Sequence, residues 1–363
     1  MPFKDLREYI ARLAMEGEVQ RIENEIQPLF EVGAIVSRTY DLRVAAPFFT
    51  NLRGYPGSRI FGAPISLSRR KDSCFARFAA SMGMPSQSSA LEIVEQYLQR
   101  LKKPIKPTLI KDGPCKENII KGEAVDLQIF PAPVLRPGDA GPCLGTWHAT
   151  ITKNPRTGAP NPEWKLHRLM MRDKSSLRAS PHPLTNTGAQ NETNYEAQDE
   201  STEFAIAIGT EPVTPWVAGT CLPSHVTSPD PDIIGGIRGA PLELVQCETV
   251  DLTVPATSEI VIEGFILPTE RGDSPIYQVT AITHRTDPIL PVSCIGAPAD
   301  DLAVALSLTT AANLIEEVRS SDLAWESAAS PAFPGLDNIC PPEVRAKVLR
   351  NWHVYGYREE GPG

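Results

Sequence analysis

The sequence lacks several features that would assign a broad class at once. It has no run of about 18 apolar residues, so it predicts no membrane-spanning helix. The first six residues, Met1–Leu6, hold none of the apolar stretch that a secretory signal needs, which favours a cytoplasmic location. Gly-rich phosphate-binding loops, HExxH zinc motifs and GxSxG nucleophile motifs do not occur either. Any catalytic site must therefore be found from weaker patterns.

Basic charge and paired cysteines are also scarce. The formal net charge is −9, which disfavours a nucleic-acid backbone as a partner. None of the six histidines has a metal-ligand partner at helical spacing. The seven cysteines lie singly, without a CxxC pair, which favours reduced, mostly buried thiols over disulfides or a zinc site. They are Cys74, Cys115, Cys143, Cys221, Cys247, Cys294 and Cys340.

Three regions differ in texture along the 363 residues. Residues 1–117 predict an α/β domain from apolar residues at helical spacing and short strand-like runs. Residues 118–298 hold short β-like runs between Gly and Pro, typical of a barrel or sandwich. Residues 299–363 return to helical patterns, with Val344, Val348 and Trp352 as an apolar stripe near the end.

Individual elements follow from the same patterns. We expect helices at residues 3–17, 31–40, 90–101 and 300–320. We expect strands at residues 18–22, 48–52, 145–152, 204–209, 242–248, 258–267 and 277–283. The polar run 186–202 lacks periodicity and predicts a flexible insertion.

The segment 161–168 has the first pattern that suggests a site. If it is one strand, Arg168 falls on the apolar face with Trp164 and Leu166. An isolated buried charge is costly, so Arg168 needs an anionic partner there. A carboxylate or phosphate ligand would satisfy it, because arginine offers a fixed fork of donors. The alternative is an edge-strand arginine that reaches solvent.

A second pattern places two carboxylates, Glu259 and Glu263, on one face of a predicted strand. Paired carboxylates perform acid–base chemistry when each shifts the pKa of the other. The alternative, and the more frequent one, is the solvated face of a half-buried strand.

Three runs of residues are more specific. They are Gly113-Pro114-Cys115-Lys116-Glu117-Asn118, the long run from Leu242 to Gly264 with Val254-Pro255-Ala256-Thr257-Ser258-Glu259, and Ile289-Leu290-Pro291 with Ser293-Cys294. In these runs the sequence resembles the UbiD family, especially its fungal ferulic and cinnamic acid decarboxylases. The resemblance extends from near residue 3 to about residue 310 and returns in the last helix.

The resemblance implies a fold, a cofactor and an activity. The fold is α+β: an N-terminal α/β domain, a split β-barrel that binds a flavin, and a reduced helical C-terminal portion. The cofactor is prenylated FMN, made by a separate flavin prenyltransferase, together with a divalent metal (usually Mn²⁺) and K⁺. Family members decarboxylate α,β-unsaturated or aromatic acids, and a carboxylic acid returns a proton. We therefore expect a small carboxylic acid as substrate, a homodimer, and neither nucleic acid nor membrane as partner.

The resemblance also assigns roles to matching positions. Arg168 stands where the family keeps its catalytic arginine, and Asp273 replaces the first glutamate of an acid network formed with that arginine. The implied metal ligands are Glu163, His182 and Asp230. The implied cofactor-binding residues are Trp164, Leu166, Arg168 and Cys221.

Two parts of the family pattern have no counterpart, namely the second glutamate of the acid network and a C-terminal lysine motif. Two other interpretations therefore remain open. The chain could keep the fold but bind a small acid, or perform another step in a biosynthetic pathway. Alternatively, the missing segments could reflect intron-boundary errors in the coding sequence.

Overall fold

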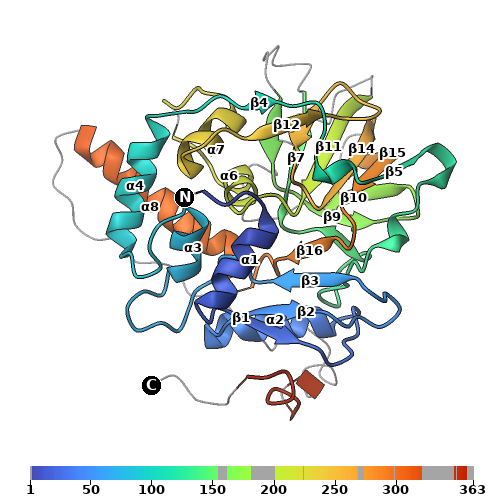
Figure 1. The fold of residues 1–363 in the computed structure, drawn as a ribbon, viewed down its shortest axis with the longest axis horizontal. Coiled ribbons are helices and arrows are strands. Elements are labelled where there is room, and N and C mark those ends of the chain that lie inside the picture. Colours follow the sequence, from blue (N-terminus) through green and yellow to red (C-terminus); the bar gives the residue numbers. More distant parts are fainter. Residues whose placement is uncertain are drawn as a thin grey trace.

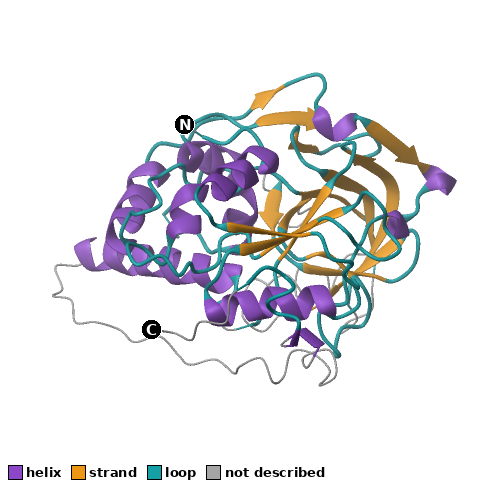
Figure 2. Ribbon diagram, turned by 60° about the horizontal axis from the view of Figure 1, so that its bottom comes forward, coloured by secondary structure: helices purple, strands orange, loops and turns teal. Residues whose placement is uncertain are grey.

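The computed structural model describes residues 2–153, 162–180, 201–223, 225–268, 274–297, 299–320, 347–348 and 350–357. Two β-sheets lie one beside the other, and a group of helices flanks them (Figure 1). Seen from a second direction, the larger sheet curls as an open half-barrel (Figure 2). The expected α+β class is confirmed.

The smaller of these sheets has the order β1-β2-β3-β16 in the described part of the chain. Its strands are β1 (Val19–Ile22), β2 (Ala46–Phe49), β3 (Arg59–Gly62) and β16 (Ile289–Val292). Helices α1 (Leu6–Met15) and α2 (Glu31–Leu42) accompany it. Helix α1 begins where the Asp5 side chain accepts the amide of Glu8. Because β16 pairs in parallel with β3, the chain returns to this first sheet after completing the large one.

The large sheet follows the order β6-β9-β10-β15-β14-β11-β7-β8 among the described residues, and β5 pairs with β15. Its strands are β5 (Asn118–Lys121), β6 (Cys143–Gly145), β7 (His148–Thr152), β8 (Glu163–Lys165), β9 (Arg168–Met171), β10 (Ser176–Ser180), β11 (Thr202–Ile208), β14 (Ile260–Leu267) and β15 (Ile276–His284). Strand β11 alternates large side chains on one face, such as Ile206, with alanines on the other. Small side chains on that second face leave room for helices to pack closely.

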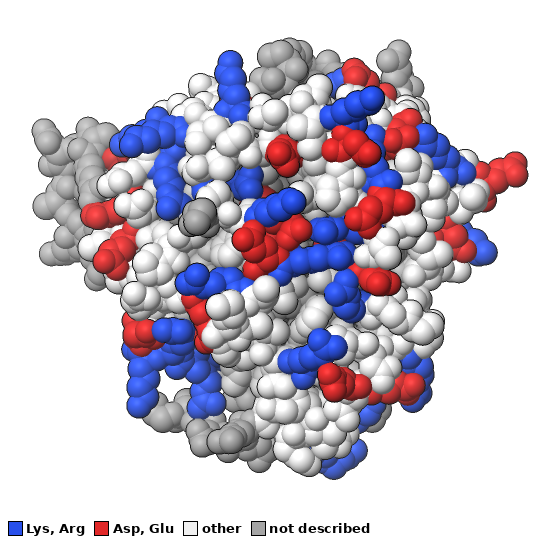
Figure 3. All heavy atoms as spheres, in the orientation of Figure 1, with Lys and Arg blue, Asp and Glu red and all other residues white. Residues whose placement is uncertain are grey.

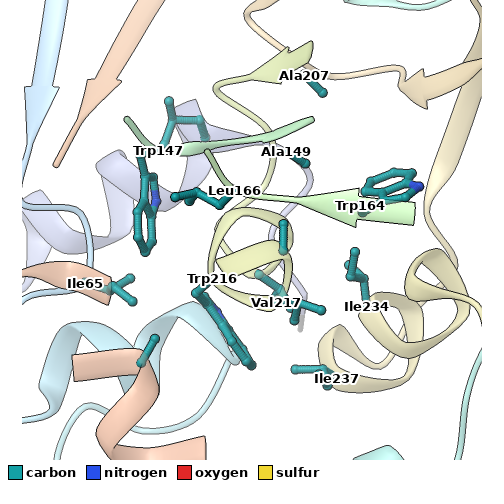
Figure 4. Close-up of a cluster of buried hydrophobic side chains, with 14 of the residues drawn as sticks. Ile65, Trp147, Ala149, Trp164, Leu166, Ala207, Trp216, Val217, Ile234 and Ile237 are labelled. Atoms are coloured by element: carbon teal, nitrogen blue, oxygen red, sulfur yellow. The ribbon is translucent and has the colours of Figure 1, made fainter. Parts of the chain in front are cut away.

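A small sheet, β13-β12-β4, joins strands β4 (Thr108–Leu109), β12 (Glu243–Gln246) and β13 (Thr253–Pro255). The flanking helices are α3 (Ala76–Ser81), α4 (Ala90–Leu101), α6 (Val213–Gly219), α7 (Asp230–Arg238) and α8 (Asp301–Ser320). Short 3₁₀ turns occur at Pro114–Lys116, Gly122–Ala124 and Leu127–Ile129. Trp216 of α6 is fully buried, with its ring 5.0 Å from that of Phe78 and 6.0 Å from that of Tyr97. This tryptophan lies in the apolar cluster between the large sheet and the helices (Figure 4).

The C-terminal segment docks against α2. Trp352 is 1% exposed and stacks on Tyr357, with the ring centroids 4.3 Å apart. The Tyr355 hydroxyl donates to Glu31 of α2 at 2.7 Å. Val348 is buried here as well, whereas Val344 of the predicted stripe lies outside the described residues.

Three further expectations concern the polar run 186–202, the cysteines and membrane-spanning helices. The polar run 186–202 lies outside the described residues up to position 200. All six cysteines that the structure describes are free, in line with the predicted reduced thiols. Across the described helices, length and apolar character fall short of what a bilayer crossing needs. Acidic and basic side chains adjoin one another on the face drawn in Figure 3.

Candidate active site

Arg168 is the first residue of β9, and its side chain is only 10% exposed. Its Nη2 donates to Oδ1 of Asp139 and, at 3.4 Å, to Sγ of Cys143. The Asp139 side chain is 1% exposed, so this ion pair is withdrawn from water. The predicted anionic partner therefore exists within the chain, and the alternative of a solvent-reaching arginine is wrong.

Asp139 is itself held rigidly. Its Oδ2 accepts the amides of Leu135 at 3.0 Å and Arg136 at 3.1 Å, which leaves Oδ1 for Arg168. The Cys143 thiol also points to Oδ2, at 3.5 Å, and burial raises its pKa to about 12, so it remains a neutral donor. A carboxylate fixed by two backbone amides gives the arginine an anchor that does not depend on side-chain rotation.

A glycine brings the loop of Asp139 to β9. A Cβ on Gly141 would lie 2.5 Å from the carbonyl oxygen of Met171, closer than real contacts allow. The Met171 amide then donates to the Pro142 carbonyl at 2.8 Å. The sequence reasoning missed Asp139. Its signal is an aspartate between Gly138 and Gly141 in a proline-bounded loop.

The expected single strand across residues 161–168 is wrong. Strand β8 ends at Lys165 and β9 begins at Arg168, and these two strands lie near opposite ends of the large sheet's strand order. The amide of Leu166 donates to the carbonyl of Ala218 at 2.9 Å and so leaves the β8 ladder. The predicted shared face of Trp164, Leu166 and Arg168 is lost at this turn. Asn161, the first residue of the segment, lies outside the described residues.

Two of the implied metal ligands come together. Glu163 lies on β8, and Asp230 opens α7 and accepts the amide of Trp164 at 2.9 Å. Burial raises the pKa of Asp230, and the nearby Glu163 carboxylate adds to that rise. Two close carboxylates fit a hard cation such as Mn²⁺ or Mg²⁺, which prefers oxygen ligands. The third implied ligand, His182, is outside the described residues, which hold no group of three possible ligands.

Two of the implied cofactor-binding residues, Leu166 and Cys221, lie at the end of α6. Trp164 and Leu166 are each 3% exposed and lie inside the apolar cluster of Figure 4. A Cβ on Gly219 would be 3.6 Å from Cβ of Leu166, so the end of α6 lies against that side chain. Cys221 follows and is exposed. Arg168 is separated from this group by the turn between β8 and β9.

The two strand carboxylates are neither solvated nor paired. Glu259 is fully buried and binds Arg7, with its Oε1 2.7 Å from Nε. Glu263 is 1% exposed and accepts the amides of Glu248 and Thr249, each at 2.8 Å. Both the solvated-face interpretation and an acid–base pair are therefore wrong. The implied acid, Asp273, lies outside the described residues.

A buried histidine adds a feature that the sequence did not reveal. His148 of β7 is fully buried, and its Nε2 lies 3.1 Å from the Thr150 hydroxyl. Burial, helped by neighbouring His167, lowers the pKa of His148 to about 3, so the imidazole is neutral. Among the described residues, its Nδ1 has no hydrogen-bond partner. A buried polar nitrogen without a partner is a candidate contact for a polar atom of a ligand.

Comparisons with known proteins show which family the chain resembles. Residues 10–97 match the model of the 3-octaprenyl-4-hydroxybenzoate carboxy-lyase N-terminal domain, and residues 108–274 match that of the Rift-related domain of the same enzymes, UbiD. The chain is 30% identical to pyrrole-2-carboxylic acid decarboxylase of Pseudomonas aeruginosa, over 92% of this chain and 71% of that protein. It is 29% identical to ferulic acid decarboxylase 1 of Saccharomyces cerevisiae, over 96% of this chain and 71% of that protein.

Solved structures show the same fold. An evolved dimeric form of the UbiD-class enzyme HmfF from Pelotomaculum thermopropionicum, in complex with prFMN, superposes with a TM-score of 0.72 at 27% identity. That likeness covers 88% of this chain and 73% of the other. Vanillic acid decarboxylase of Sedimentibacter hydroxybenzoicus gives a TM-score of 0.76 at 23% identity, over 88% of this chain and 70% of the other.

Proposed function

Because the chain belongs to the UbiD family of carboxy-lyases, we propose that it decarboxylates an α,β-unsaturated or aromatic carboxylic acid with prenylated FMN as cofactor. The relatives named above act on pyrrole-2-carboxylic acid and ferulic acid, and one neighbour holds prFMN, which supports both the cofactor and the substrate class. Within this chain the observation that carries the proposal is the buried, anchored guanidinium of Arg168.

Arg168 binds the carboxylate of the substrate in this proposal. Its hydrogen bonds to described residues all leave from Nη2, so Nε and Nη1 can serve as donors for the acid. A site this buried excludes water from the carboxylate and orients the bond that breaks. When bound, prenylated FMN supplies the electron sink that receives the electron pair left behind by carbon dioxide.

The cation site holds Mn²⁺ through Glu163, His182 and Asp230 in this proposal, with K⁺ as a second ion. Support comes from Asp230, whose pKa is raised by burial and by the nearby Glu163 carboxylate. Hard cations combine carboxylate ligands with phosphate oxygens, so a cation there would fix the phosphate of FMN. The residues that contact the cofactor are Trp164, Leu166, Arg168 and Cys221.

The carbon that loses carbon dioxide must gain a proton, and we assign that donor to Asp273. Asp139 is a poor alternative, because its two oxygens are already occupied by Arg168 and by the amides of Leu135 and Arg136. A separate flavin prenyltransferase supplies the cofactor, and the protein works as a cytoplasmic homodimer.

A second candidate function follows from the parts of the family pattern that have no counterpart here, the second glutamate of the acid network and the C-terminal lysine motif. Without them, the site could bind a small acid through Arg168 without turning it over. In this case the chain keeps the family fold in a biosynthetic pathway but has lost decarboxylation.

Reconstitution distinguishes the two functions. The purified protein is loaded with prenylated FMN and Mn²⁺, and release of carbon dioxide is measured from cinnamic, ferulic and pyrrole-2-carboxylic acids. We expect release from at least one acid, and a fall of about 10²–10⁴-fold in Arg168→Gln, the effect typical of a lost charge-stabilising donor. Absence of both flavin absorbance and gas release would contradict the proposal. Thermal stabilisation by the acids but not by the flavin would then support the second candidate.

A further inference from the structure

We propose that Asp139 is the positioning residue for Arg168, and that its carboxylate sets the preference of the site for acids over uncharged analogues. This inference rests on the proposed function only in taking Arg168 as the group that binds the acid. Asp139 contacts Arg168 and the backbone of its own loop. This role needs no contact between Asp139 and the ligand.

The charged side chains of Arg168 and Asp139 are both buried. The Arg168 side chain is 10% exposed and that of Asp139 is 1% exposed, so neither charge is compensated by water. A guanidinium left alone in such a place would be strongly disfavoured and would turn towards other acceptors. Asp139 therefore decides where Arg168 points.

The contacts of the Arg168 side chain have a defined direction. Oδ1 of Asp139 receives Nη2 of Arg168, and Sγ of Cys143 receives the same nitrogen at 3.4 Å. Both anchors lie on one corner of the guanidinium plane. Among the described residues this leaves Nε and Nη1 without an anchor, so a carboxylate can approach them while Nη2 stays fixed.

The Asp139 carboxylate, which anchors Arg168, is held rigidly. Oδ2 of Asp139 is held by two backbone amides, and Gly141 lets the loop approach the carbonyl of Met171, the last residue of β9. The neighbouring Arg136 donates to the carbonyls of Cys294 and Ile295, which ties the same loop to the end of β16. The orientation of Arg168 is therefore set by a loop that two sheets hold in place.

The test compares binding of cinnamate and its uncharged analogue cinnamamide to the cofactor-free protein by calorimetry. The measured quantity is the acid preference, defined as the Kd of the amide divided by the Kd of the acid. We expect the wild-type protein to prefer the acid and Asp139→Asn to lose about tenfold of that preference, the effect of one misplaced charge-assisted hydrogen bond. In an Arg168→Gln background, Asp139→Asn should change nothing further, because it acts only through the arginine.

Two controls separate positioning from stability. Glu18→Gln removes one partner of another buried ion pair, between Glu18 and Arg77 at 3.3 Å, and should destabilise the protein while leaving the acid preference unchanged. If Asp139→Asn does not fold, Asp139→Glu keeps the charge on a longer side chain and should show a smaller loss of preference.

Three results would overturn the inference: a wild-type protein without acid preference, an unchanged preference in the Asp139 variants, or a preference that rises in Asp139→Asn. The last result would show that Asp139 competes with the ligand. Failure of the proposed function looks different. A wild-type protein that prefers the acid but releases no carbon dioxide when loaded would refute decarboxylation and leave the role of Asp139 intact.

Discussion

Glu259 offers a sharp test of how buried charge holds this fold together. Its carboxylate is fully buried at the start of β14 and accepts Nε and Nη2 of Arg7 at 2.7 and 2.8 Å. It also accepts Nη1 of Arg285 at 3.3 Å and the amide of Ile289, the first residue of β16, at 3.0 Å. One side chain thus joins α1, the large sheet and the sheet β1-β2-β3-β16.

We expect Glu259→Gln to lower the free energy of unfolding by about 3 kcal/mol, the lower end of the cost of breaking a buried ion pair. The amide keeps the size of the side chain but turns a donor towards the arginines. The value falls at the lower end for two reasons. Arg7 is 33% exposed and keeps the carbonyl of Thr286, and Arg285 keeps Asp5 at 2.8 Å.

The matched control is Glu25→Gln. Glu25 also receives two nitrogens of one arginine, Arg53, at 2.7 and 2.5 Å, but those side chains are 50% and 66% exposed. Solvent screening limits its contribution to less than about 1 kcal/mol. Urea unfolding measures both variants, with an unchanged slope as the sign that only stability has moved. If Glu259→Gln loses no more stability than Glu25→Gln, burial does not strengthen this pair and the reasoning fails.

Two other changes test buried groups near the candidate site. The pKa of His148 is lowered to about 3 in the folded protein. Below pH 6.5 this imidazole therefore takes up a proton in the unfolded chain but stays neutral in the folded protein. The advantage of wild type over His148→Gln in unfolding free energy should therefore shrink by about 1.4 kcal/mol per pH unit between pH 6.5 and 4, and a constant difference would contradict this. Gly141→Ala should displace the loop from Met171, lower stability by roughly 1–3 kcal/mol in urea, and reduce the acid preference. Unchanged values in both assays would show that the close approach is unimportant.

Local patterns predicted the elements whose causes are local. The helix expected at residues 90–101 is α4, with the same bounds, because its apolar stripe and the capping box of Ser89 and Glu92 lie within the segment. The helix expected at residues 300–320 is α8, shifted by one residue at its start. The strands β7, β11, β14 and β15 of the large sheet were expected for the same reason. The order of the strands in the sheet depends on pairings that no window of sequence contains.

The segment 161–168 failed because a distant contact overrides its alternation. Its pattern of alternating residues is regular, but the carbonyl of Ala218 captures the amide of Leu166 and ends β8. The partners of Glu259 and Glu263 were missed in the same way. Arg7 stands 252 residues from Glu259 in the chain, so nothing local distinguishes its buried carboxylate from a solvated one.

The sequence predicted that Arg168 needs an anionic partner, but it did not identify that partner. The cost of burying Arg168 required an anion nearby, and that requirement is met. Identifying Asp139 required the approach of a loop 29 residues earlier in the chain, which depends on the missing side chain of Gly141. Glu163 and Asp230 were proposed as metal ligands from the family resemblance alone, because strand β8 and helix α7 lie far apart in sequence.

The anchoring of Arg168 by Asp139 separates two tasks that a single acid network would combine. A carboxyl group that both holds an arginine and returns a proton must change its charge during each cycle, and the arginine loses its counter-ion whenever the group is protonated. Asp139 accepts two backbone amides and a guanidinium, so both of its oxygens are engaged. In the proposed reaction Arg168 therefore keeps its orientation, and the proton comes from another group.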